Sequence, residues 1–336
     1  RARARPVALA IADLQTPGGA GGGAGAGASA ADMAGSFAGS GRVGQPGACD
    51  VKHAAAGWPA RRMSTQQDYY RQNEAYAEFL ENWDAGFYEK YAAALRPAKA
   101  GGRVLDAGCG VGQVVARLTA AGCEAHGVDV SEPNIERARR HSPFCRLYDG
   151  RRLPYADGFF DSAGALHARA NFPGPGAIPQ EPCPPGALNV LEHVEEPEAF
   201  LTELCRVVRP GGRIVVSSPN FLRVLGPGYH PRMRGPANRW RNLSGLLARR
   251  RALADGKAPV RFERMAPIVR RPFRPDDDAV IVTNPVEIAA ALARCGAVVE
   301  RVECTDRVVP AALEWLLNAT PLRWAMLNAF VVARKN

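Results

Sequence analysis

The sequence predicts an α/β fold, in which a mainly parallel sheet carries helices on both faces. Three observations predict it: short apolar strands alternate with amphipathic helices after residue 102, a glycine-rich turn follows the first strand, and acidic residues follow successive strands. The 336 residues and 46% hydrophobic content suit one large domain or two modest ones. No apolar run is long enough to span a bilayer, and the eight cysteines include no C-x-x-C pair, which argues against a zinc ribbon.

Residues 1–62 form a low-complexity leader, which we expect to be disordered and to have no catalytic role. Its central stretch is mostly Gly, Ala and Ser, and it holds too little apolar surface to offset its ordering entropy. The leader is either an organelle transit peptide or translated upstream sequence with Met63 as the start. The composition changes near Met63, which favours the second interpretation and a cytoplasmic protein.

Residues 63–100 are expected to form a helical N-terminal cover. Aromatic side chains recur there mostly at steps of three and four residues: Tyr69, Tyr70, Tyr76, Phe79, Trp83, Phe87, Tyr88 and Tyr91. One or two amphipathic helices packed on the main domain explain this pattern best. An aromatic lid over a substrate is the alternative.

Strands are expected where short apolar runs lie between turn residues. These runs occupy residues 104–105, 124–130, 144–148, 160–166, 213–218, 297–303 and 325–333. The first five belong to a core at residues 101–219, and the last two belong to a closing segment at residues 284–336.

Helices are expected where apolar residues recur with helical spacing and capping residues precede them. The expected segments begin near Val114, at Ser131 with Pro133 in the first turn, at Glu195, at Asn284 and at Pro310. Pro210-Gly211-Gly212 is expected to end the helix at 195–208. Asn284-Pro285-Val286-Glu287 resembles a capping box, in which Glu287 reaches back to the helix start.

One segment, residues 167–188, interrupts the core without any periodicity. It is rich in Pro and Gly, and the triplet Gly-Ala-Leu occurs at 164–166 and again at 186–188. Deleting 167–188 joins the fourth strand directly to the helix-like run 189–194. We therefore interpret the segment as a late insertion, such as a retained intron, and keep a functional loop as the alternative.

The residues with the clearest chemical meaning are acids and glycines at three successive strand ends. Asp106 ends the first strand and precedes the turn of Gly108, Gly110 and Gly112. Glycine lets the backbone turn sharply and lets a ligand approach main-chain N–H groups. Asp129 follows the second strand, where a carboxylate can accept two ribose hydroxyls, and Asp149 follows the third. The G-x-G-x-G spacing differs from the G-x-G-x-x-G typical of nicotinamide dehydrogenases, which disfavours that class.

With these motifs in order, the chain resembles the class I S-adenosylmethionine-dependent methyltransferases, specifically the small-molecule branch often called type 11. The matching stretches are residues 104–112, 127–131, 149–161, 189–197 and 204–219. The resemblance implies a Rossmann-like, doubly wound, seven-stranded sheet with an antiparallel last strand, and S-adenosyl-L-methionine as the cofactor. It implies that the three glycines flank the methionine moiety, Asp129 holds the ribose, Asp149 and Gly150 meet the adenine, and Asn189 lies beside the cofactor. The expected cofactor-binding residues are Asp106, Gly108, Gly110, Gly112, Asp129, Val130, Asp149, Gly150 and Asn189.

The acceptor is expected to be a small molecule or a lipid- or glycan-linked one, recognised by a cap at residues 220–283. This segment is rich in Arg and carries Tyr229 and Trp240, so it indicates either an anionic acceptor held by guanidinium groups or a solvated basic surface. The net charge of +10 keeps an RNA methyltransferase as an alternative, and a catalytically silent cofactor-binding protein is another. No metal is expected, because the carboxylates of Asp276–Asp278 are adjacent in sequence and rarely converge on one ion.

No general base can be named from the sequence. His193 follows the insertion near the expected cofactor edge, but packing at a helix start explains it better than catalysis does. Tyr229 and His230 are the residues better placed to face a substrate. A hydroxyl acceptor would need such a base, whereas a stronger nucleophile would not.

Overall fold

The computed structural model describes residues 86–166, 190–226, 230–254, 258–268, 279–305 and 308–336. The leader, most of the helical cover and the expected insertion lie outside these residues. The helices are α4 (Gly86–Leu95), α5 (Gln113–Ala120), α6 (Glu132–Ala138), α7 (Pro197–Val207), α8 (Pro236–Ala254), α9 (Pro285–Arg294), α10 (Ala311–Asn318) and α11 (Leu322–Ala325), with short 3₁₀ helices η1 (Leu191–His193) and η2 (Pro231–Met233). The strands are β1 (Arg103–Ala107), β2 (Glu124–Asp129), β3 (Cys145–Leu147), β4 (Phe160–Ala165), β5 (Val208–Pro219), β6 (Glu263–Arg264), β7 (Ile281–Val282), β8 (Ala297–Glu303) and β9 (Asn328–Lys335).

Seven strands form one sheet in the order β3-β2-β1-β4-β5-β9-β8. The strands β1 to β5 pair in parallel, and the last strand, β9, pairs antiparallel with both β5 and β8. The order reverses at β1 and β4, as expected of a doubly wound sheet, whose ligands bind at the carboxyl ends of the strands near that point. The expected seven-stranded sheet with an antiparallel last strand is confirmed.

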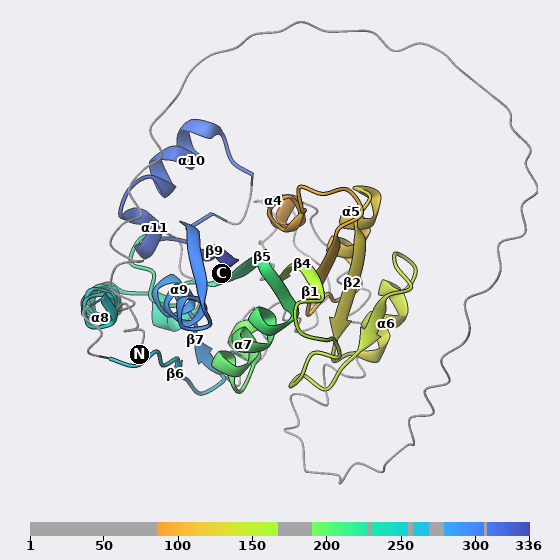
Figure 1. Ribbon diagram of the computed structural model, residues 1–336. Helices are drawn as coiled ribbons and strands as arrows, with labels where there is room; N and C mark the ends of the chain where they lie inside the picture. The colour runs from red at the N-terminus through yellow and green to blue at the C-terminus, as the bar shows by residue number, and fades with distance from the viewer. Residues whose placement is uncertain (1–85, 167–189, 227–229, 255–257, 269–278, 306–307) are drawn as a thin grey trace, which may run out of the picture. The chain divides into compact units, whose positions relative to one another are not determined.

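Helices cover both faces of the sheet (Figure 1). Apolar side chains of α4, α5 and α6 pack with Val104, Val215 and Val332, while those of α7 and α9 pack with Leu105 and the opposite-facing residues of β5 and β9. Successive residues of each central strand therefore point into different apolar layers, as the period of two in a strand requires. Burial on both faces explains why these strands are mostly apolar rather than regularly alternating with polar residues; Asp106 of β1 and Ser162 of β4 are buried polar exceptions.

Two expected strand boundaries are wrong. Strand β5 begins at Val208, so Pro210-Gly211-Gly212 lies inside the strand instead of separating a helix from it. The pairing with β4 moves from Val208 to Arg213 while β4 advances only from Phe160 to Ser162, so the extra residues bulge out. Strand β9 begins at Asn328 rather than at 325, because Leu322–Ala325 forms the short helix α11.

Two expected helix starts differ from the structure in their side-chain contacts. The Asn284 side chain caps α9 by accepting hydrogen bonds from the N–H groups of Val286 and Glu287, at 3.1 and 3.0 Å. The Glu287 carboxylate does not complete a capping box; it accepts from Arg249 and from the Arg261 N–H instead. Ser131 lies at the N-cap of α6, but its side chain makes no capping hydrogen bond.

The expected cap segment contributes helix α8 and a two-stranded antiparallel sheet of β6 and β7. The expected helix-like run at 189–194 is only the single turn η1, and the Val280 N–H of the adjoining segment donates to the Glu192 carbonyl oxygen. Within the described ranges, none of the helices has the combination of length and apolar character that a membrane crossing requires.

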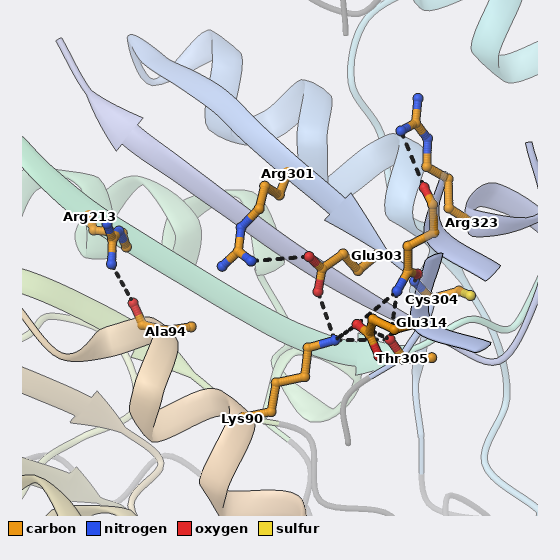
Figure 2. Close-up of polar contacts among 10 residues, drawn as sticks. Lys90, Ala94, Arg213, Arg301, Glu303, Cys304, Thr305, Glu314 and Arg323 are labelled. Carbon is orange, nitrogen blue, oxygen red and sulfur yellow. Dashed lines mark hydrogen bonds and ion pairs between the residues drawn. The ribbon is translucent and has the colours of Figure 1, made fainter. Parts of the chain in front are cut away.

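Helix α4 is tied to the far end of the chain by one lysine (Figure 2). Lys90 forms ion pairs with Glu303 of β8 and with Glu314 of α10, and it donates to the Thr305 hydroxyl at 2.9 Å. Its ammonium group also lies 5.2 Å from the centre of the Phe330 ring. These contacts fix the position of α4 and hence of Tyr91, the residue after Lys90.

Replacing Lys90 by Met is expected to lower the free energy of unfolding by about 1.5–3 kcal/mol, the usual range for hydrogen bonds to charged groups. The two carboxylates would then lie near each other without the cation between them, and both are less than one-third exposed. Denaturant unfolding of the full chain measures the effect. Lys99→Met, at an exposed position, is the matched control and should change stability by no more than about 0.5 kcal/mol. Equal losses in both variants would contradict the anchoring role.

Candidate functional site

Asp106 lies in the middle of the sheet between two glycines. Its register partners are Gly127 of β2 and Gly164 of β4, so the three residues share one row and one face. The Tyr91 hydroxyl uses the space above Gly164 and donates to Asp106 Oδ1 at 3.1 Å. A Cβ at Gly164 would lie only 2.6 Å from that hydroxyl and 2.4 Å from the Val215 carbonyl oxygen. The missing side chain at 164 is therefore what admits Tyr91 to Asp106.

The turn after β1 holds the three expected glycines. All three have positive φ angles, and that of Gly108 is 79°. The N–H groups of Gly108 and Cys109 both donate to the Val128 carbonyl oxygen, at 2.7 and 3.0 Å. A Cβ at Gly108 would lie 2.2 Å from a methyl carbon of Val190, so this position requires glycine for its backbone angle and for space.

Asp129, at the end of β2, connects this turn to the start of α6. Its Oδ2 accepts from the Gly110 N–H at 2.9 Å, and its Oδ1 accepts from the Ser131 N–H at 2.8 Å and from the Asn134 amide at 3.3 Å. The side chain is 8% exposed. The structure thus brings Asp129 to the glycine turn, as expected, and adds a positioning role that the sequence did not indicate. Its contact with a ribose stays a prediction.

The electrostatics of the site favour a positively charged ligand. Burial raises the pKa of Asp106 to about 7; the Tyr91 hydrogen bond opposes this shift and the Asp129 charge adds to it. Burial also raises the pKa of Asp129, although the backbone hydrogen bonds from Ser131 and Gly110 lower it. Within the part of the chain that the structure describes, no Lys or Arg pairs with either carboxylate. A cation placed between the acids would stabilise their ionised forms.

The expected adenine end is more open. Asp149 is exposed, and its Oδ1 accepts from the N–H groups of Arg151 and Arg152 at 2.8 and 3.1 Å, which shapes the turn after β3. A Cβ at Gly150 would lie 3.3 Å from a Val130 methyl carbon, so the expected pair Val130 and Gly150 lies side by side. Contact of these residues with adenine stays a prediction.

Asn189 lies outside the described residues. The next residue, Val190, packs against Gly108 and is partly buried. The chain therefore returns to the glycine turn directly after the expected insertion.

Sequence reasoning missed a third buried acid, Glu192 of η1. It is fully buried, accepts from the Ser218 hydroxyl at 3.2 Å, and has a pKa raised to about 7 by burial. Because Ser218 is near the end of β5, Glu192 lies at the same carboxyl edge of the sheet as the glycine turn. The run Leu191-Glu192-His193-Val194 resembles a helix start, where an acid is ordinarily exposed, so the pattern contained no signal for this burial.

The structure describes only some of the residues considered as candidate bases. His230 is buried; its Nδ1 accepts from the Arg232 N–H at 3.2 Å, and its ring packs edge-on against Phe221. These contacts cap η2. Tyr229 and the acids at 276–278 lie outside the described residues, and nothing in the geometry assigns a proton transfer to His193.

Fold and site together point to a protein class: the region that holds them is similar to the S-adenosylmethionine-dependent methyltransferases. A family profile described as a methyltransferase domain matches residues 98–234, which contain the glycine turn, the three strand-end acids and η1.

Curated relatives are similar over the same region. The ubiquinone biosynthesis O-methyltransferase of Aromatoleum aromaticum is 33% identical over 137 residues, covering 39% of this chain and 52% of the relative. That of Xanthomonas euvesicatoria is 29% identical over 167 residues, covering 45% and 64%. The chain thus spans about half to two-thirds of the length of these relatives. Among solved structures, an S-adenosylmethionine-dependent methyltransferase from Mesorhizobium loti aligns over 76% of this chain and 100% of its own, with 18% identity and a TM-score of 0.44.

Proposed function

We propose that this chain transfers the methyl group of S-adenosylmethionine to a small-molecule acceptor. The observation that carries the proposal is a pair of buried carboxylates, Asp106 and Asp129, which lie at a glycine turn and have no basic partner among the described residues. S-adenosylmethionine carries a sulfonium and an ammonium group, so it supplies the positive charge that this pair lacks. When bound, the cofactor supplies an activated methyl group for in-line displacement.

The protein's own contribution is to bind and orient the two reactants and to exclude water from them. Asp106 would hold the ammonium end, the turn at Gly108–Gly112 would accept the methionine part against its main chain, and Asp129 would accept from the ribose. Positioning of the two reactants can supply most of the rate enhancement when the transferred group is already activated. We assign no general base to the reaction.

A small acceptor is supported by a cavity of about 520 Å³ beyond the end of β5, within the range of small-molecule pockets. Its lining includes Leu222, Phe262 and Val282 and three arginines, Arg249, Arg261 and Arg264. Arg249 is neutralised by Glu287, and Arg264 pairs with Glu196. The Arg261 guanidinium makes no ion pair with the described residues, which supports an acceptor with one anionic group. The names of the curated relatives, ubiquinone biosynthesis O-methyltransferases, support a hydroxyl-bearing small molecule.

A screen with radiolabelled cofactor tests the substrate class. The full chain is incubated with labelled S-adenosylmethionine and either a small-molecule extract or total RNA. Label is expected in the small-molecule fraction. Transfer only to RNA, with retention that weakens steeply with salt, would replace the proposal by the RNA alternative.

Replacing Asp129 by Ala is expected to weaken S-adenosylmethionine binding by about 1–3 kcal/mol, roughly 5- to 150-fold. The variant loses the ribose acceptor and also the bonds that hold Gly110 and the start of α6. Isothermal titration calorimetry measures the affinity. Glu136→Ala removes an exposed acid of α6 and serves as the control, for which we expect wild-type affinity. Unchanged affinity in Asp129→Ala would refute the ribose assignment.

A further inference from the structure

Two cysteines meet above Gly127, next to the candidate cofactor turn. Cys109 lies between Gly108 and Gly110 of the turn, and Cys145 of β3 is the direct register partner of Gly127. A Cβ at Gly127 would lie 2.7 Å from the Cys109 sulfur and 3.1 Å from the Cys145 sulfur. Both sulfurs therefore use the space that the glycine leaves open, and they belong to the same apolar layer.

Both thiols are free and buried. Hydrogen bonding with Cys145, together with burial, raises the pKa of the Cys109 thiol, while the same hydrogen bond lowers the pKa of Cys145. Cys145 is thus the thiol that ionises more readily of the two, and Cys109 is the neighbour that can resolve an oxidised intermediate on it.

We propose that Cys109 and Cys145 are a modification site, which hydrogen peroxide converts to a disulfide, and that this disulfide weakens S-adenosylmethionine binding. The second half rests on the proposed function; the first half does not. Cys145 attacks one oxygen of the peroxide, forming a sulfenic acid and releasing water. The Cys109 sulfur then attacks the sulfenic sulfur, a second water leaves, and the S–S bond forms. Two thiols are oxidised, and one peroxide is reduced to two waters.

The disulfide would act on binding through the turn itself. A disulfide draws the sulfurs to about 2.05 Å, closer than any non-bonded contact. Cys109 is flanked by glycines, so the turn can follow its side chain toward β3. That movement displaces the Gly110 N–H, which donates to Asp129 at 2.9 Å. The turn would then no longer present its main chain and Asp129 in the arrangement that the reduced protein has.

A second pair of neighbouring cysteines provides a matched control. Cys205 of α7 and Cys295 at the end of α9 also interact, but they lie on the other face of the sheet, in the layer away from the turn. Cys205→Ser should therefore leave both the Cys109–Cys145 disulfide and cofactor affinity unchanged. Cys145→Ser should abolish the disulfide and the peroxide effect on affinity, while the untreated variant still binds the cofactor.

The test uses the full chain, treated with hydrogen peroxide, alkylated, digested without reductant and analysed by mass spectrometry. We expect a peptide pair joined through Cys109 and Cys145, absent in Cys145→Ser and present in Cys205→Ser. We also expect S-adenosylmethionine affinity, measured by calorimetry, to fall by roughly 5- to 100-fold on oxidation and to recover with dithiothreitol. Because linkage is reciprocal, saturating cofactor should reduce the disulfide fraction in a fixed glutathione redox buffer.

Absence of the joined peptides in the oxidised wild-type chain would overturn the modification site. A mapped disulfide with unchanged affinity would overturn its effect on binding. A fully reduced chain that does not bind S-adenosylmethionine would instead overturn the proposed function and with it the binding effect, while the peptide map would still decide whether the two cysteines form the pair.

Discussion

Replacing Gly164 by Ala is expected to destabilise the protein by about 1–3 kcal/mol, the range typical of overpacked cores. The new methyl group would meet the Val215 carbonyl oxygen of the neighbouring strand at 2.4 Å and the Tyr91 hydroxyl at 2.6 Å. The carbonyl belongs to a paired strand and cannot move aside without disturbing the sheet. Tyr91 would be displaced from Asp106, so cofactor affinity should fall as well. Denaturant unfolding and calorimetry on the same preparation measure the two losses.

Gly245→Ala is the control for this substitution. Gly245 lies within α8, and a Cβ there would meet no atom within 4 Å. Alanine is favoured over glycine in a helix by about 0.5–1 kcal/mol, so this variant should be more stable than the wild type. If both alanine variants shifted stability in the same direction, the tight packing at 164 would be disproved.

Replacing Asp106 by Asn should have opposite effects on stability and on binding. The pKa of Asp106 in the folded chain is about 7, well above its ordinary 3.8, so the folded state without cofactor binds this proton more tightly than the unfolded state does. The stability that the group contributes is therefore complete below its ordinary pKa and is lost as the pH rises through about 7. Asparagine removes this loss, and the variant should be more stable than the wild type at pH 8.

For cofactor binding we expect the opposite effect: Asp106→Asn should bind less tightly than the wild type at pH 8. The cationic ligand prefers the ionised carboxylate, so wild-type affinity should increase as the pH rises through about 7, and Asp106→Asn should lack that increase. At pH 8 we expect a loss of about 1.5–3 kcal/mol, or roughly 10- to 150-fold. Glu192 also has a pKa of about 7, so Glu192→Gln is the matched control. If Glu192→Gln rather than Asp106→Asn flattened the profile, the ammonium role assigned to Asp106 would be wrong.

The positions of the strand-end acids and of the glycine turn could be predicted because they depend on local order along the chain. An apolar run followed by Asp106 and alternating glycines already specifies a strand, a turn and a helix start. The antiparallel last strand came from the family resemblance rather than from any pattern in residues 325–333. The structure confirms the strand, the turn and the helix start, and the antiparallel pairing of β9.

Features that depend on contacts between distant segments could not be predicted. Tyr91 lies in a helix whose aromatic pattern indicates only packing, and its bond to Asp106 requires the gap at Gly164 on a third segment. Glu287 fits a capping box in sequence, but in the fold its carboxylate accepts hydrogen bonds from Arg249 of α8 and from the Arg261 N–H instead. Pro210-Gly211-Gly212 has the composition of a helix stop, and only pairing with β4 shows that β5 starts before it.

Under the proposed function the two faces of the sheet would carry different tasks, and this matters for engineering. Tyr91 and the two thiols lie in the layer with α4 and α5, whereas Phe262 and Val282 of the cavity lie in the layer with α7 and α9. Mutant libraries intended to widen the range of accepted molecules can therefore vary the cavity wall while sparing positions 91, 127 and 164. Substitutions in the cavity wall, on one side of the sheet, should then leave the charged groups on the other side unchanged.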